Sequence, residues 1–180
     1  FFFFFLQRRK CCHSTPAPIM SSAEVVISSW KNVKAIDNYE EVAGVLLFRK
    51  IFKIAPEAHD LFRFTKGFEP NSEELFESAR LKIHSKGVIA TVDAAVGLLE
   101  KNDLDKLVEV LRELGRRHNK YGVQLPHFEI VGTALIQTLQ YALGDAFTSE
   151  VEAAWLEIFG VMQTEMMTGI ERGQAFECEC

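Results

Sequence analysis

Two consecutive helical patterns, each with a histidine where an apolar side chain is expected, fill residues 81–118. In both, the members recur every three or four residues, which puts them on one face of a helix, and such a face normally points inward. The first set is Leu81, His84, Val88, Val92, Ala95 and Leu99, and the second is Leu104, Leu107, Leu111, Leu114 and His118. The pattern therefore predicts two imidazoles that point into the interior from neighbouring helices.

An inward-facing histidine has two interpretations. A single one is more often a core side chain, hydrogen-bonded to a backbone carbonyl, than a metal ligand. Two on adjacent helices make the interpretations comparable, because a buried imidazole is costly without a partner. Two histidines without Cys, Asp or Glu on the same faces are too few for a structural zinc site, which takes about four protein ligands. An iron porphyrin needs only one or two axial ligands, usually histidine.

Composition predicts a single globular domain. The chain has 180 residues, enough for one domain with its own core. Hydrophobic residues make up 48% and charged residues 25%, which argues against intrinsic disorder. The net charge is −5, so nucleic acid is not an expected partner. All four cysteines lie near the chain ends, so no disulfide framework is expected in the core and a reducing, cytoplasmic setting fits.

Residues 1–20 differ from the rest of the chain. The apolar run from Phe1 to Leu6 is too short to span a bilayer. Basic residues follow it, and then Cys11 and Cys12. We expect a disordered or non-native N-terminal extension here. The alternative is a membrane association through S-acylation of the two cysteines beside the basic residues.

From residue 21 onward, helix starts and stops alternate, and no stretch shows the period-two pattern of a strand. Capping boxes are expected at Ser21 and at Asn71, each with a glutamate three residues later. Pro56 is expected to end one helix and Pro126 to begin another. The pattern predicts an all-α fold of about seven to eight helices.

The last helix sets the expected domain limits. Thr148 or Ser149 is expected to cap it, and Gly169 to end it together with a further glycine four residues later. We therefore predict a folded domain over residues 21–169 and a flexible C-terminal tail over residues 170–180.

The spacing of several residues resembles the globin family, and within it the neuroglobin-like intracellular globins. Phe62 lies six residues after Pro56, and His84 lies 22 residues after Phe62. The matching runs are Leu114-Gly115-Arg116-Arg117-His118, Val92-Asp93-Ala94-Ala95-Val96, Leu143-Gly144-Asp145-Ala146-Phe147-Thr148 and Ala154-Trp155. The resemblance extends roughly from residue 21 to residue 167. It implies the globin fold, in which helices surround a haem pocket.

The resemblance also implies roles for individual residues. His118 matches the proximal histidine that binds haem iron, and His84 matches the distal histidine on the other side of the ring. Phe62 matches the phenylalanine that stacks on the porphyrin. The other pocket residues implied by the resemblance are Phe48, Val88, Leu114, Val123, Phe128 and Val131.

One departure concerns the haem propionates. Gly87 stands where neuroglobins tend to carry a lysine that pairs with a propionate. The partners of the propionates are therefore left open among Lys86, Arg117, Lys120 and Tyr121.

As a function, the resemblance implies an intracellular globin with haem b that reversibly binds O2, NO or CO. It implies bis-histidyl, six-coordinate iron at rest, with His84 as the second axial ligand. No catalytic residue is expected, and the protein is expected to be a monomer or homodimer. The alternatives are NO dioxygenation or nitrite reduction, which would need a reductase partner, and redox or gas signalling at the same haem.

Overall fold

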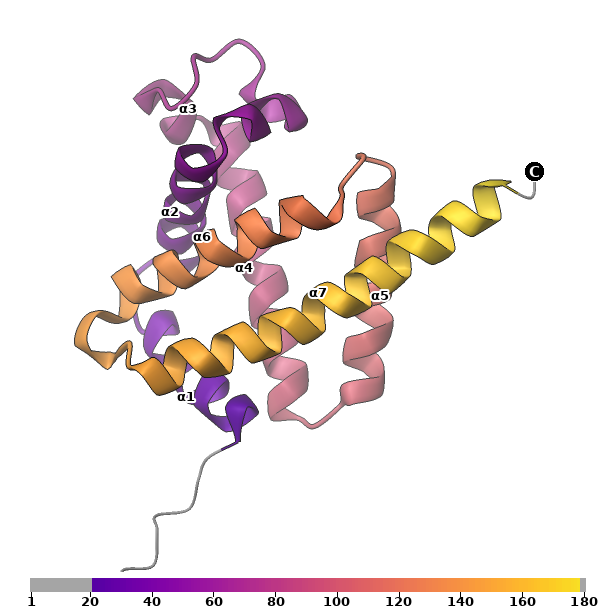
Figure 1. Ribbon diagram of the computed structural model, residues 1–180. Helices are drawn as coiled ribbons and strands as arrows, with labels where there is room; N and C mark the ends of the chain where they lie inside the picture. Colours follow the sequence, from indigo (N-terminus) through magenta and orange to yellow (C-terminus); the bar gives the residue numbers. More distant parts are fainter. Residues whose placement is uncertain (1–20, 179–180) are drawn as a thin grey trace, which may run out of the picture.

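A computed structural model describes residues 21–178, all of them helical or in connecting turns (Figure 1). No strand occurs in this range, which confirms the expected all-α fold. The α-helices are α1 (Ser22–Lys34), α2 (Tyr39–Ile54), α3 (Glu73–Glu77), α4 (Ala79–Glu100), α5 (Leu104–Asn119), α6 (Leu125–Leu143) and α7 (Ser149–Cys178). The short 3₁₀ helices are η1 (Pro56–Leu61), η2 (Arg63–Thr65) and η3 (Gly144–Ala146). Residues 1–20, with Cys11 and Cys12, lie outside the described range.

Serine side chains begin the first and third α-helices. The Glu24 backbone N–H donates to Ser21 Oγ at 3.3 Å, and the Ser21 N–H donates to the Glu24 carboxylate at 2.7 Å. This confirms the expected capping box. The second expected cap is wrong, because the side chain that accepts a backbone N–H at the start of α3, from Leu75, is Ser72 Oγ and not that of Asn71.

The helical segment that follows Asn71 consists of two helices. Ser78 has an extended backbone and ends α3, and its Oγ accepts the N–H of Leu81 to begin α4. Asn71 itself has a φ of +60°, a left-handed conformation that asparagine tolerates. The break separates a one-turn helix from the long helix that carries His84.

The main core joins α1, α2, α4, α6 and α7. Its largest fully buried side chains include Trp30 and Trp155, with ring centroids 5.6 Å apart. Each indole N–H is satisfied: Trp155 Nε1 donates to Ser29 Oγ at 2.9 Å, and Trp30 Nε1 donates to Asp93 Oδ1 at 2.8 Å. Buried tryptophans usually need such acceptors, so these bonds fix how α1 packs on α4 and α7.

Helix α5 is held mainly by α7 rather than by the main core. Its buried residues Leu107 and Leu111 form a separate apolar cluster with Ala95 of α4 and with Met162 and Met166 of α7. Figure 1 shows α4 and α5 joined by a short turn at one end and diverging toward the other. The beginning of α4 and the end of α5, which carry the two histidines, are thus at the diverging ends.

Helix α7 is longer than expected. It continues to Cys178, so Gly169 does not end it. Gly169 is buried inside the helix, next to α5. Within residues 21–178, no helix is long and apolar enough to cross a membrane.

Candidate functional site

His118 lies in the last turn of α5 and is half-buried. Its Nδ1 lies 2.8 Å from the carbonyl oxygen of Leu114, one turn earlier. A carbonyl only accepts a hydrogen bond, so Nδ1 carries the proton and donates. In the neutral ring this leaves the Nε2 lone pair free, which is the form of histidine that binds a metal.

His84 lies one residue away from the most buried stripe of α4. That stripe contains Leu81, Ser85 and Ile89, each 1% exposed or less. The sequence pattern predicts His84 on the inward face, whereas the residue as a whole is exposed in the structure. His84 therefore lies at the flank of α4 rather than in the core.

Three phenylalanine rings lie against the His84 imidazole and bury part of it. Their centroids lie 5.4 Å away for Phe48, 5.7 Å for Phe62 and 4.9 Å for Phe64. Burial against these groups lowers the pKa of His84 below its ordinary value, and the positive charge of His118 lowers it further. The two histidines are thus close enough to influence one another, and His84 is kept neutral near pH 7.

Phe62 is positioned by the two short helices η1 and η2. It lies between them with an extended backbone. The buried Thr65 hydroxyl lies 2.8 Å from the His59 carbonyl oxygen and 2.6 Å from the Phe62 carbonyl oxygen. This hydroxyl closes the turn and holds the Phe62 backbone beside the start of α4.

The other predicted pocket residues fall into two groups. Phe48 and Phe128 are buried, at 2% and 6% exposed. Half-buried apolar side chains come from α4, α5, α6 and the turn before α6; they are Val88, Leu114, Val123 and Val131. Apolar side chains that stay half-open beside two imidazoles suit a flat, apolar ligand with a metal at its centre.

The donor set fits haem better than a bare metal ion. In the part of the chain that the structure describes, no three His, Cys, Asp or Glu residues gather as a metal site. The two imidazoles come from neighbouring helices, and Nε2 of His118 would be an axial ligand of the kind that haem iron takes. The residues present thus fit a haem group.

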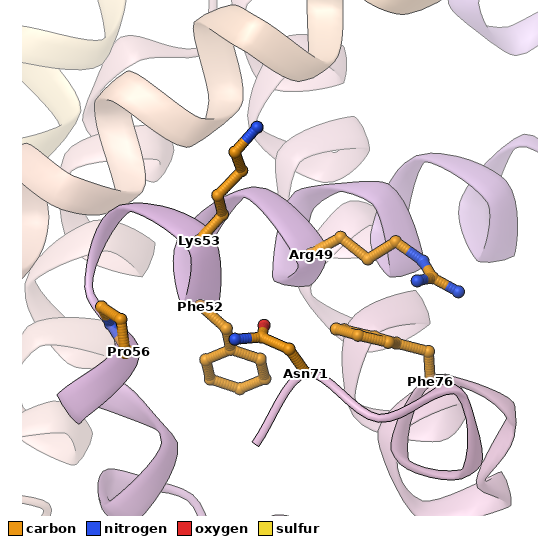
Figure 2. Close-up of a pocket in the computed structure, with 6 residues that line it drawn as sticks. All are labelled: Arg49, Phe52, Lys53, Pro56, Asn71 and Phe76. Atoms are coloured by element: carbon orange, nitrogen blue, oxygen red, sulfur yellow. The ribbon is translucent and has the colours of Figure 1, made fainter. Parts of the chain in front are cut away.

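Two shallow surface pockets lie elsewhere. One has a volume of about 340 Å³ and is lined by Arg49, Phe52, Lys53, Pro56, Asn71 and Phe76 (Figure 2). Its arginine is already paired with Glu73 and stacked over the Phe76 ring, 4.0 Å from the centroid. In Figure 2 the Lys53 side chain points away from the pocket. Neither this pocket nor the second, between α2 and α6, includes a predicted site residue.

The sequence model of the Globin family matches residues 45–166, more than half of the chain. The chain belongs to the globin family. Neuroglobin of Tetraodon nigroviridis is 32% identical to this globin over 146 residues, which cover 81% of this chain and 88% of that protein. Neuroglobin of Dissostichus mawsoni is 31% identical over the same shares of both chains. These relatives confirm that this globin is neuroglobin-like.

A solved structure supports the same fold. The crystal structure of a hexacoordinated heme protein from an anhydrobiotic tardigrade, determined at pH 4, has a TM-score of 0.75 to this globin. It is 25% identical in sequence, and the match covers 86% of this chain and 96% of the tardigrade chain.

Sequence reasoning missed Phe64 as a site residue of this globin. Its ring stacks on Phe62 with the centroids 5.0 Å apart, and it is the ring that lies nearest His84. The three phenylalanines of residues 62–68 were the available signal, since a solvated loop rarely holds so many.

Three of the possible propionate partners are already in contact with protein groups. Arg117 Nε donates to the Glu113 carboxylate at 3.1 Å. Lys86 Nζ lies 3.8 Å from the Glu41 carboxylate. Tyr121 is exposed, and its ring meets the His118 ring edge-on with centroids 6.4 Å apart.

Proposed function

We propose that this globin binds haem between α4 and α5 and reversibly binds O2 and other diatomic gases at its iron. His118 would be the proximal ligand, and His84 the second axial ligand at rest. Phe48, Phe62, Val88, Leu114, Val123, Phe128 and Val131 would line the pocket. The haem would be haem b, because the sequence has no C-x-x-C-H motif for covalent attachment.

The observation that carries this proposal is the state of the two imidazoles. The Leu114 carbonyl accepts the His118 Nδ1–H, so Nε2 is the ring nitrogen that can reach a metal. The pKa of His84 is lowered, so its ring is neutral near pH 7. A protonated imidazole nitrogen cannot bind a metal. The lowered pKa of His84 favours its metal-binding form, and the Nδ1–H···O bond of His118 assigns Nε2 as the metal-binding atom of that ring.

The surrounding side chains support the same role. Bound haem supplies an iron centre that takes one or two axial ligands and can hold a diatomic gas. The rings of Phe48 and Phe62, which lie against His84, would limit the access of water on that side of a bound haem and so slow oxidation of its iron. If His84 occupies the second axial position, the apparent gas affinity falls by the fraction of protein in which that position is free.

We infer a gas-binding rather than an enzymatic role, and a cytoplasmic location, from the likeness to neuroglobins. Steady-state consumption of NO or nitrite in the presence of a reductase would contradict a purely gas-binding role. The rate to compare is that of free haem in the same buffer. Turnover far above that rate, lost on replacing His84 or His118, would make the protein an enzyme.

Visible absorption spectra of the purified protein test the proposal. The oxidised, reduced and CO-bound forms should each show haem absorbance. Sharp low-spin bands are expected in the reduced, gas-free form, and His84→Leu should replace them with one broad high-spin band. A colourless protein after haem addition would overturn haem binding. An unchanged spectrum in His84→Leu would overturn only the axial role of His84.

A further inference from the structure

The backbones of α5 and α7 cross in contact at two glycines. A methyl group on Gly115 would lie 2.0 Å from the Met166 carbonyl oxygen, and one on Gly169 would lie 2.1 Å from the Arg112 carbonyl oxygen. No side chain fits at such distances, so only glycine allows the two helices to approach this closely. Figure 1 shows α7 passing over α5 at this crossing.

An ion pair joins the same two turns. Arg112 Nε donates to Glu165 Oε2 at 2.7 Å, and the side chains are 32% and 20% exposed. Partly buried charge-assisted bonds are stronger than those at an open surface. This ion pair therefore stabilises the position at which α7 crosses α5.

The crossing lies directly beside the atoms that hold His118. Leu114, whose carbonyl accepts the His118 Nδ1–H, is the neighbour of Gly115. Apart from this crossing and its small apolar cluster with α7, α5 meets mainly the end of α4. A displacement of α7 at residues 165–169 would therefore move the backbone that orients the imidazole.

We propose that the α5–α7 crossing, formed by Gly115, Gly169 and the Arg112–Glu165 pair, positions His118 against the haem iron. The proposal rests on the haem-binding function proposed above. Gly169 lies beyond the residues matched by the family model, which end at 166. The last part of α7 would thus set the strength of the bond between His118 and the haem iron. Through that bond it would influence the ratio of six- to five-coordinate haem.

The test uses haem-loaded full-length protein and two kinds of variant. Glu165→Gln removes the charge of the ion pair without adding volume, and Gly169→Ala pushes the helices apart. The matched controls lie on the same helix. Glu152→Gln changes an exposed glutamate, and Gly160→Ala adds a methyl group that meets nothing within 4 Å.

The readout is the iron–histidine stretching band in the resonance Raman spectrum of reduced protein, recorded with His84→Leu so that every sample is five-coordinate. Both test variants should shift this band, and neither control should. With His84 present, the ratio of six- to five-coordinate haem should change by roughly two- to tenfold. Thermal unfolding measured in parallel separates this effect from a loss of stability.

An unshifted band in both variants would overturn the proposal, even if their unfolding temperatures fall, because the crossing would then be structural only. If Gly169→Ala does not fold, Glu165→Gln decides by itself. Wild-type protein without haem absorbance would instead overturn the proposed function, and this inference with it.

Discussion

The Nδ1 atom of His118 lies 2.8 Å from the carbonyl oxygen of Leu114, so one backbone group fixes both the proton and the orientation of the ring. The bond leaves Nε2 directed away from its own helix turn. This hydrogen bond therefore favours His118 over His84 as the permanent iron ligand.

Replacing His118 with glycine should therefore weaken haem retention by at least roughly tenfold, since a change of even a supporting group at a metal site often costs that much. The measurement is the rate of haem transfer to an excess of a haem-free acceptor globin. Added imidazole should restore most of the lost absorbance, because it can take the position of the missing side chain.

His127→Gln is the matched control for that variant. His127 Nδ1 accepts the Gln124 N–H at the start of α6, and it makes no contact with His84 or His118 among the interactions of the described residues. If His118→Gly kept haem at the wild-type rate with the wild-type spectrum, His118 would not be a ligand.

Acid should destabilise the haem-free protein through His84. Its folded pKa lies below the ordinary value of about 6.5, so the unfolded chain binds the proton first as the pH falls. The free energy of unfolding should thus be unaffected by this group above about pH 7. It should then decrease as the pH falls through the ordinary pKa toward the lowered one.

Denaturant titrations at several pH values between about 7.5 and 5 measure this effect. His84→Leu should show a flatter dependence on pH over the same range, because it has no proton to bind. Parallel curves for the wild type and His84→Leu would mean that burial of His84 does not influence stability.

The sequence pattern predicted α5 well and α4 less well, for a physical reason. On α5, Leu107, Leu111, Leu114 and His118 follow the expected face, and only Leu104, in the open first turn, is exposed. On α4 the buried stripe includes Ser85. This serine lies where α2 approaches α4 closely at Gly44, and a pattern of apolar residues does not include it.

The predicted end of α7 at Gly169 was wrong for a similar reason. A glycine usually signals the end of a helix, yet Gly169 lies within α7 because the α5 backbone leaves no space for a side chain. Close approach between helices depends on residues far apart in sequence. The globin resemblance supplied the pairing of His84 with His118, which periodicity alone left open between core and ligand.

Removing the Phe64 ring should weaken the hold of His84 on the iron. Phe64 is the aromatic ring nearest His84, and it also stacks on Phe62. Aromatic pairs contribute about 0.5–1.5 kcal/mol beyond their buried area, so Phe64→Ala should lower the ratio of six- to five-coordinate haem by roughly two- to tenfold. The ratio is read from the visible bands of the reduced protein.

Phe68→Ala is the control for this variant, because Phe68 is half-buried in the same loop and makes no ring contact with His84. An equal change in both variants would assign the effect to a general loosening of the loop. The rate of CO binding, which His84 limits when it is an axial ligand, should rise in Phe64→Ala only.

The contact between α2 and α4 can be tested at Gly44, because α4 carries His84. A methyl group on Gly44 would lie 2.8 Å from the backbone carbonyl group of Ser85, the residue next to His84. Gly44→Ala should therefore destabilise the fold by about 1–3 kcal/mol, the usual cost of overpacking, and should displace the start of α4. Gly97→Ala, at an open position of α4, should instead stabilise it by about 0.5–1 kcal/mol. Chemical denaturation of both variants measures the difference, and equal stabilities would show that the two helices do not touch at Gly44.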